Sequence, residues 1–344
     1  MRNGRQKVLE VKNAVKHYRQ KMLTLPDGRR LKNQLVKAVD GVSFALFSGE
    51  ILGVIGESGC GKSTLGRLLV KLEPLTGGDI LINGKSIQSV NTKSKAGRLA
   101  FRKTVQLIFQ NPYESVDPRE TVERILMTPL KLHGIGSSED ERRKICVEAL
   151  ETAGLKPAED FLSRYPCELS GGQLQRIAIM RAMILNPAFV VADEPISMLD
   201  VSIRADILNL LKEQTKNKNA CMVFISHDIA TTRYISDKVA VMYLGRIVEY
   251  GNADDVMHRP VHPYTRALIS NAASIDPDEK RQPIEIQGEP PSPVGTGPGC
   301  FFAPRCFLRT ERCEQEYPPM ADCGGGHWFS CFNAQPDEGK EQVP

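Results

Sequence analysis

The sequence contains no uninterrupted apolar stretch that approaches the ~18 residues of a membrane-spanning helix, so we expect that the chain does not cross a bilayer by itself. Residues 1–7 are basic, but no long apolar segment follows them, which makes them a poor secretory signal. Charge of one sign is also scarce, because 45 Lys and Arg against 41 Asp and Glu leave a net charge of +4. Dedicated nucleic-acid binders usually have a concentrated basic face, so this balance argues against that class. The cytoplasm is the expected location.

The length of 344 residues allows either one large α/β domain with an appendage or two domains. With 41% hydrophobic and 25% charged residues, the chain is expected to fold around a substantial core. Helical periodicity dominates residues 111–185, and the polar, basic stretch 20–37 is expected to be a hairpin or a long loop. Short apolar runs predict strands at 8–11, 39–46, 51–55, 189–192, 222–225 and 239–242. Strands that alternate with helices indicate a mainly parallel sheet.

The segment Gly56-Glu57-Ser58-Gly59-Cys60-Gly61-Lys62-Ser63 fits the pattern G-x-x-x-x-G-K-[ST] between a predicted strand and a predicted helix. In this context glycines let backbone N–H groups converge on phosphate oxygens, and the helix N-terminus adds a positive dipole end. Lys62 is expected to reach the terminal phosphates, and the Ser63 hydroxyl to ligate Mg²⁺. A chance glycine-rich turn is the alternative, and the flanking elements argue against it.

Polar residues that suit phosphoryl transfer follow other predicted strands. Asp193 and Glu194 come directly after strand 189–192, where Asp193 would bind Mg²⁺ and Glu194 would act as general base toward the γ-phosphate. An acidic pair that caps the next helix is the alternative. His227 follows strand 222–225 and Gln110 follows the apolar residues 107–109, so both are candidates for the same site; each would otherwise be an ordinary loop residue.

A second glycine turn, Leu169-Ser170-Gly171-Gly172-Gln173, precedes a helical run that extends from Leu174 to Leu185. The Ser170 hydroxyl and the backbone amides at this helix start would suit an anion. A helix capped in the ordinary way by Ser170 is the alternative.

In chain order, these motifs resemble those of the nucleotide-binding subunits of ATP-binding cassette (ABC) transporters, over about residues 8–270. The resemblance implies an α/β fold: a P-loop NTPase with a RecA-like core, an N-terminal antiparallel β-subdomain, an inserted helical subdomain at about 111–185 and a small Cys-rich C-terminal extension. It implies an ATPase domain at 1–275 and the extension, with a linker, at 276–344.

The resemblance also assigns roles to single residues. Glu194, His227 and Gln110 would be catalytic, and Ser63, Gln110 and Asp193 would ligate Mg²⁺. Tyr18 would stack on adenine, unless it is a core residue. The ATP-binding set is Tyr18, Gly56, Ser58, Gly59, Cys60, Gly61, Lys62, Ser63, Thr64, Ser170, Gly171, Gly172, Gln173, Asp193 and Asp200. Two positions depart from the family pattern: Cys60 replaces a small hydroxyl residue, with a thiol open to oxidation or alkylation, and Leu174 replaces a frequent basic residue.

A narrower resemblance is to the ATPases of oligopeptide/dipeptide importers. The stretches that carry it are 108–115, 165–173, 199–203, 262–265 and 288–293. It implies a subunit that hydrolyses ATP to drive import of di- and oligopeptides. Importers of nickel, metallophores or glutathione belong to the same branch, and a soluble ABC ATPase remains the alternative outside transport.

The same resemblance implies partners. A paralogous ATPase subunit would pair head to tail with this one, so that Ser170, Gly171 and Gly172 would serve a nucleotide held mainly by the partner. Two transmembrane permease subunits would contact residues 110–119, and an extracytoplasmic substrate-binding protein would act indirectly. No nucleic acid is expected, and the subunit would be peripheral at the cytoplasmic face of the inner membrane.

Five cysteines crowd the end of the chain after a Pro- and Gly-rich stretch at 276–299: Cys300, Cys306, Cys313, Cys323 and Cys331. In a reducing compartment such a group suggests metal or cluster ligation more than disulfides. Structural zinc usually shows tight C-x₂₋₄-C pairs, which are absent here. Resemblance to cluster-bearing peptide importer ATPases favours a [4Fe–4S] cluster on Cys300, Cys306, Cys313 and Cys331. Zinc, free thiols or disulfides stay open, and Cys323 makes the fourth ligand ambiguous.

Overall fold

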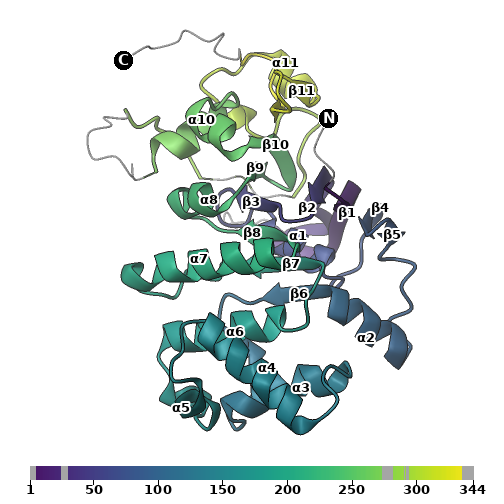
Figure 1. Cartoon of the computed structure of the whole chain (residues 1–344). Coiled ribbons are helices and arrows are strands. Elements are labelled where there is room, and N and C mark those ends of the chain that lie inside the picture. Colours follow the sequence, from purple (N-terminus) through teal and green to yellow (C-terminus); the bar gives the residue numbers. More distant parts are fainter. Residues whose placement is uncertain (1–4, 25–29, 273–281, 290, 292–293, 335–344) are drawn as a thin grey trace. The chain divides into compact units, whose positions relative to one another are not determined.

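The computed structural model describes residues 5–24, 30–272, 282–289, 291 and 294–334 (Figure 1). Its contacts divide the chain into two compact units, neither of which is one continuous segment. The first comprises Met1–Glu10, Ala45–Ile51 and Ile80–Phe224, and the second comprises Val11–Phe44, Leu52–Asp79 and Ile225–Pro344. Residues 276–281, 290, 292 and 293 of the predicted linker lie outside the described residues, as does the polar end at 335–344.

The first unit is built on strands β6 (Val105–Ile108), β7 (Phe189–Asp193) and β8 (Cys221–Ile225), in the order β8-β7-β6. β6 and β7 are parallel, with Ile108 opposite Ala192. All of β8 is buried, as are the first four residues of β7, which is the pattern of parallel strands covered on both faces. The strands predicted at 189–192 and 222–225 are therefore confirmed.

Helices supply most of the first unit. The predicted helical segment 111–185 is confirmed, and α6 begins at Gly171, three residues earlier than the helical run predicted from Leu174. α3 packs against α4, α5 and α6, and α6 packs against α7. The bounds are α2 (Lys95–Thr104), η1 (Pro112–Ser115), α3 (Val122–Leu132), α4 (Glu139–Thr152), α5 (Ala158–Leu162), η2 (Pro166–Glu168), α6 (Gly171–Met183) and α7 (Val201–Asn217).

The second unit has its own strands, in the order β11-β12-β10-β9-β3. They are β3 (Ile51–Ile55), β9 (Lys238–Tyr243), β10 (Arg246–Asn252), β11 (Ala321–Asp322) and β12 (Trp328–Phe329). β3 and β9 are parallel, whereas β10 is antiparallel to both β9 and β12. The strands predicted at 51–55 and 239–242 are confirmed, and the Cys-rich end of the chain continues the same sheet.

Helices of the second unit follow the strands that position the site. α1 directly follows the glycine-rich loop after β3, and α8 follows β8. The bounds are α1 (Lys62–Leu69), α8 (Ile229–Ile235), α9 (Ala253–His258), α10 (Pro263–Ser270), η3 (Ala303–Arg305) and α11 (Arg312–Gln315). Across the described ranges of both units, none of the helices combines the length and the apolar character that a membrane span requires.

A four-stranded sheet with the order β2-β1-β4-β5 completes the fold. Its strands are β1 (Lys7–Thr24), β2 (Arg30–Phe47), β4 (Gly77–Ile82) and β5 (Lys85–Ser86). The strands predicted at 8–11 and 39–46 are parts of β1 and β2. Most of the stretch 20–37 is strand, so it forms the two arms of a hairpin and not a long loop; residues 25–29 lie outside the described residues.

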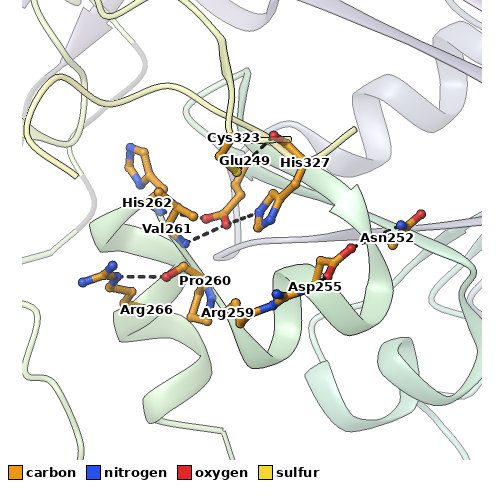
Figure 2. A network of polar contacts seen from close by, with 10 residues as sticks. All are labelled: Glu249, Asn252, Asp255, Arg259, Pro260, Val261, His262, Arg266, Cys323 and His327. Carbon is orange, nitrogen blue, oxygen red and sulfur yellow. Dashed lines mark hydrogen bonds and ion pairs between the residues drawn. The ribbon is translucent and has the colours of Figure 1, made fainter. Parts of the chain in front are cut away.

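A buried carboxylate joins β10 to the C-terminal segment (Figure 2). Glu249 is fully buried, and its two oxygens accept the N–H groups of Val261 and His262, each at 2.8 Å. Its Oε1 also lies 2.7 Å from Nε2 of His327, which belongs to the Cys-rich segment. Burial lowers the pKa of His262 to about 3, so that ring is neutral at pH 7.

Candidate functional site

The glycine-rich loop 56–61 connects β3 to α1, as the motif predicts. Gly61 precedes α1 with φ of 106°, and Gly56 has φ of 149°. A Cβ atom at Gly61 would lie 2.1 Å from the carbonyl oxygen of Ala38, and one at Gly56 would lie 2.2 Å from the carbonyl oxygen of Met242. Only glycine fits at these two positions, because both the dihedral angles and the close backbone approach exclude a side chain.

Lys62 is the first residue of α1 and is only 6% exposed. Its Nζ donates to the carbonyl oxygens of Gly56 at 2.7 Å and Glu57 at 3.0 Å. The ammonium group is thus held inside the loop, where the N-terminus of α1 adds to the positive potential. Such a loop is suited to bind phosphate groups.

Tyr18 lies beside the helix that follows the loop. Burial raises the pKa of Tyr18, a hydrogen bond with Glu73 adds to the rise, and a hydrogen bond with Thr64 lowers it. The Nζ of Lys16 lies 4.8 Å from the centre of the Tyr18 ring. The structure therefore brings Tyr18 and Thr64 together, although stacking on adenine stays a prediction.

Cys60 lies within the loop but is only 3% exposed. Burial raises the pKa of its thiol, and the nearby Lys62 offsets only part of that rise. Reactive cysteines are accessible and have a lowered pKa, so the environment of Cys60 favours an inert thiol and not the oxidisable one considered from the sequence.

Two contacts to the loop come from residues that sequence reasoning did not select. The N–H of Glu57 donates to the hydroxyl of Tyr264 at 2.8 Å, and the carboxylate of Glu57 pairs with Arg305. Tyr264 stands in the family-like stretch 262–265, and Arg305 stands between Cys300 and Cys306. The sequence thus marks both residues only as members of family-like or Cys-rich stretches, and this does not indicate that either residue contacts the loop.

In the first unit, Gln110 and Glu194 lie together. Because Ile108 is opposite Ala192 in parallel strands, the residues two positions further on are also neighbours. Nε2 of Gln110 donates to Oε2 of Glu194 at 3.2 Å. Glu194 has φ of 47°, a conformation that costs a non-glycine residue about 1–3 kcal/mol and that clusters at functional sites. Asp193 ends β7 immediately before it, as predicted.

The glycine turn before α6 forms a capping box. The hydroxyl of Ser170 accepts the N–H of Gln173 at 3.3 Å, and the Gln173 side chain accepts the N–H of Ser170 at 3.0 Å. Ser170 therefore caps the helix, as the simpler interpretation predicted. Ser170 and Gly171 are also exposed, so the start of this helix faces solvent. Asp200 is exposed at the start of α7, and His227 is exposed after β8.

Four thiols of the C-terminal segment form a group: Cys300, Cys306, Cys313 and Cys331. Burial raises the pKa of Cys300 and of Cys306 to about 11, and the other thiols of the group add to the rise. N–H donors face the sulfurs: the Leu308 N–H lies 3.3 Å from Sγ of Cys306, and Nδ2 of Asn333 lies 3.3 Å from Sγ of Cys313. Backbone N–H groups also face Cys300 and Cys331.

Cys323 lies beside Glu249 and His327 (Figure 2). Its thiol donates to the carbonyl oxygen of His327 at 3.2 Å, and the charges that act on it are those of Glu249, Asp322 and Asp255. Within the described residues, no three His, Cys, Asp or Glu side chains are arranged to hold a metal ion.

The glycine-rich loop, the acidic pair after it in the chain and Gln110 define the class of the protein. A loop that can bind phosphates ends at a buried lysine, an acidic pair lies at the end of β7, and an amide side chain contacts the second acidic residue. This is the arrangement of a P-loop ATPase.

Comparison with known proteins specifies the family. The chain matches the ABC transporter family over residues 39–197 and the oligopeptide/dipeptide transporter C-terminal region over residues 248–313. It is 44% identical to the putative oligopeptide transport ATP-binding protein YkfD of Bacillus subtilis, over 91% of this chain and 94% of that protein. It is 43% identical to the dipeptide transport ATP-binding protein DppF of Escherichia coli, over 98% of this chain and 97% of that protein.

A solved structure gives the same result for the fold. The dimeric ATP-binding cassette MJ0796, in a post-hydrolysis state bound to ADP and Pi, is 27% identical with a TM-score of 0.61 and covers 71% of this chain and 98% of its own. The chain belongs to the oligopeptide/dipeptide branch of the ABC transporter ATP-binding proteins.

Proposed function

We propose that this chain binds and hydrolyses ATP to drive an ABC importer of di- and oligopeptides. The observation that carries the proposal is the contact between Gln110 and Glu194 at the end of β7, in a chain that also has an intact phosphate-binding loop. The names of relatives that match over nearly the whole chain support the peptide cargo. Nickel, metallophore or glutathione-like solutes are the alternative cargo, because the same branch serves them.

The residue roles follow from the chemistry of each group. Lys62 and the loop amides bind the β- and γ-phosphates of ATP, and Glu194 accepts a proton from the attacking water. His227 contacts the γ-phosphate, and Tyr18 stacks on the adenine ring. The donors Ser63, Gln110 and Asp193 present hydroxyl, amide and carboxylate oxygens, which suit Mg²⁺. When bound, Mg²⁺ neutralises charge on the phosphates.

The turn before α6 serves the nucleotide of a second ATPase subunit. Ser170 and Gly171 are exposed at the start of a long helix, where the positive end of the helix dipole favours a phosphate that approaches from outside. Gln173, which is half-buried, and Asp200, which is exposed, would serve the same nucleotide, as would Gly172, which is buried in the first turn of the helix. The dimeric state of the MJ0796 cassette supports such pairing. We propose that the second subunit is a paralogue of this chain.

The remaining partners are two transmembrane permeases, which contact residues 110–119, and an extracytoplasmic substrate-binding protein that acts through them. The subunit is then peripheral at the cytoplasmic face of the membrane. Residues 1–275 form the ATPase domain with its helical subdomain at about 111–185, and residues 276–344 form the extension. Support for the subdomain comes from α3, α4, α5 and α6.

Purification of the tagged full chain from detergent-solubilised membranes tests this function. We expect two polytopic membrane proteins and one related ATPase to co-purify, and the purified assembly to hydrolyse ATP faster when peptide-loaded binding protein is added. Recovery with ribosomes or DNA, and without membrane proteins, would support a soluble ABC ATPase instead. Stimulation by nickel- or glutathione-loaded binding protein alone would identify the alternative cargo.

The four-cysteine group is proposed to hold a [4Fe–4S] cluster. Each thiolate of such a cluster binds a different iron atom, so the sulfurs lie farther apart than around one metal ion, and N–H groups commonly donate to them. Neighbouring thiols of the group help to raise the pKa values of Cys300, Cys306 and Cys331, and N–H donors face the sulfurs; both observations support this ligand set. The thiol of Cys323 donates to the carbonyl oxygen of His327, which argues against it as a ligand.

Matched serine variants test the cluster. Cys313→Ser is expected to lose most of the bound iron and acid-labile sulfide, because it removes one of the four thiolates, whereas Cys323→Ser is expected to keep both. The measurement is iron and sulfide content with visible absorbance of anaerobically purified protein. Equal loss in the two variants, or an iron-free parent protein, would refute the assignment.

A further inference from the structure

We infer that Arg305 is a positioning residue for ATP binding, through which the Cys-rich segment holds the phosphate-binding loop in place. Nη1 of Arg305 lies 2.7 Å from Oε2 of Glu57, and Nη2 lies 3.0 Å from Oε1. The two residues are 248 positions apart in the chain. Two parallel charge-assisted hydrogen bonds of this kind fix both the distance and the orientation of the partners. The inference rests on the proposed binding of ATP at this loop.

The pair is largely removed from solvent. The side chain of Arg305 is 6% exposed and that of Glu57 is 25% exposed. Hydrogen bonding to Glu57 is the main reason why the pKa of Arg305 is raised. Loss of one partner would leave the other charge poorly solvated, and Glu57 would then move toward water. A surface ion pair has no such effect, because solvent replaces the missing partner.

Glu57 in turn contacts the lysine that is expected to bind phosphate. Its carbonyl oxygen accepts Nζ of Lys62 at 3.0 Å, and its N–H donates to the hydroxyl of Tyr264 at 2.8 Å. The main chain and the side chain of Glu57 are therefore both fixed from outside the loop. A shift of the Glu57 carboxylate would turn this peptide unit and displace the Lys62 ammonium.

An aromatic cluster holds Arg305 on the other side. The hydroxyl of Tyr243 accepts from Nη1 of Arg305 at 3.4 Å, and the rings of Tyr243, Tyr264 and Phe302 lie with their centres 4.7–5.4 Å apart. Tyr243, Tyr264 and Phe302 are almost fully buried, so this cluster has little freedom to move. It fixes the position from which Arg305 reaches the loop.

Arg305 also belongs to the short turn that separates two thiols of the four-cysteine group. Its N–H donates to the carbonyl oxygen of Phe302 at 2.9 Å, and the next residue, Cys306, donates to that of Ala303 at 3.2 Å. The N–H of Ala303 donates to the carbonyl oxygen of Cys300 at 3.0 Å, so Cys300 and Cys306 are hydrogen-bonded to the two ends of this turn. Affinity for ATP at the loop should therefore respond to changes in the Cys-rich segment.

The test is a double-mutant cycle in the full chain with Arg305→Gln, Glu57→Gln and the two combined. Titration with a fluorescent ATP analogue gives the dissociation constant, and steady-state assays give KM and kcat. Each single variant is expected to weaken binding and raise KM by about 10-fold with kcat nearly unchanged, as for a typical coupling between sites. The double variant is expected to bind no more weakly than either single variant, because the two changes break one interaction.

Arg309→Gln is the matched control. Arg309 lies in the same segment, and its pair with Glu314 is about half exposed, so its loss should leave ATP affinity unchanged. Arg305→Lys keeps the charge but loses the two-pronged geometry, and it is expected to bind ATP with intermediate affinity. It also provides a second measurement if Arg305→Gln does not fold.

Parent-like affinity in the Arg305 variants, additive effects in the double variant, or equal weakening by Arg309→Gln would each overturn the inference. Failure of the parent chain to bind the analogue would refute ATP binding itself, so the two failures are distinguishable. Melting temperatures without nucleotide check that each variant is folded.

Discussion

Glu194→Gln is expected to lower the rate of ATP hydrolysis by about 100-fold or more, because general-base catalysis contributes roughly 10²–10⁴. The amide cannot take a proton from the attacking water, but it keeps the size of the side chain and can still contact Gln110. Affinity for ATP is expected to stay within a few-fold of the parent value, since the phosphate-binding loop is unchanged. Phosphate release at saturating ATP, alongside binding of a fluorescent ATP analogue, measures the two effects separately.

Glu213→Gln provides the control for that variant. Glu213 is an exposed glutamate on α7, so its substitution makes the same change of charge away from the site. Hydrolysis by Glu194→Gln at the parental rate would remove Glu194 from the mechanism. A loss of hydrolysis in Glu213→Gln as well would show that the charge change acts through general destabilisation.

Lys62→Ala is expected to weaken ATP binding by about 10- to 100-fold, the loss that accompanies removal of a charged hydrogen-bond partner. In the structure the ammonium is buried and donates to two carbonyl groups of its own loop, which fix its position there. Hydrolysis should fall further than binding, because the charge also stabilises the transition state. Equilibrium titration and phosphate release measure both.

Lys216→Ala is the corresponding control, since Lys216 is an exposed lysine in the last turn of α7. It should bind and hydrolyse ATP like the parent. If Lys62→Ala retained parental affinity, the phosphates would have to bind elsewhere, and the assignment of the glycine-rich loop would fail.

Local sequence predicted the parts of the site that depend on neighbours in the chain. The glycine-rich loop lies between a strand and a helix because Gly56 and Gly61 occupy backbone positions closed to other residues. The pairing of Gln110 with Glu194 follows from two parallel strands whose ends are level. Apolar runs bounded by polar residues were sufficient to locate β7 and β8 to within one residue.

Contacts between distant segments were beyond the reach of such reasoning. Glu57 occupies a position of the loop motif at which any residue is allowed, so the motif assigns it no role. Its contacts with Arg305 and Tyr264 are seen only in the folded structure. The distinction between Cys323 and the other four thiols likewise depends on β11 and β12, which are too short to be recognised from apolar periodicity. For the stretch 20–37 a hairpin could not be distinguished from a long loop, because polar residues there gave no alternating pattern.

The short strand β12 has a consequence for the handling of this protein. It pairs with β10 through Glu249 and Tyr250, and His327 nearby supplies the partner of the Glu249 carboxylate. A shortened chain that ended before residue 321 would expose main-chain donors and acceptors of β10 and would leave the buried Glu249 carboxylate without its His327 partner. Exposed sheet edges pair with strands of other chains, so such a fragment is expected to aggregate on expression. The C-terminal segment should therefore be kept in any preparation made for crystals or assays.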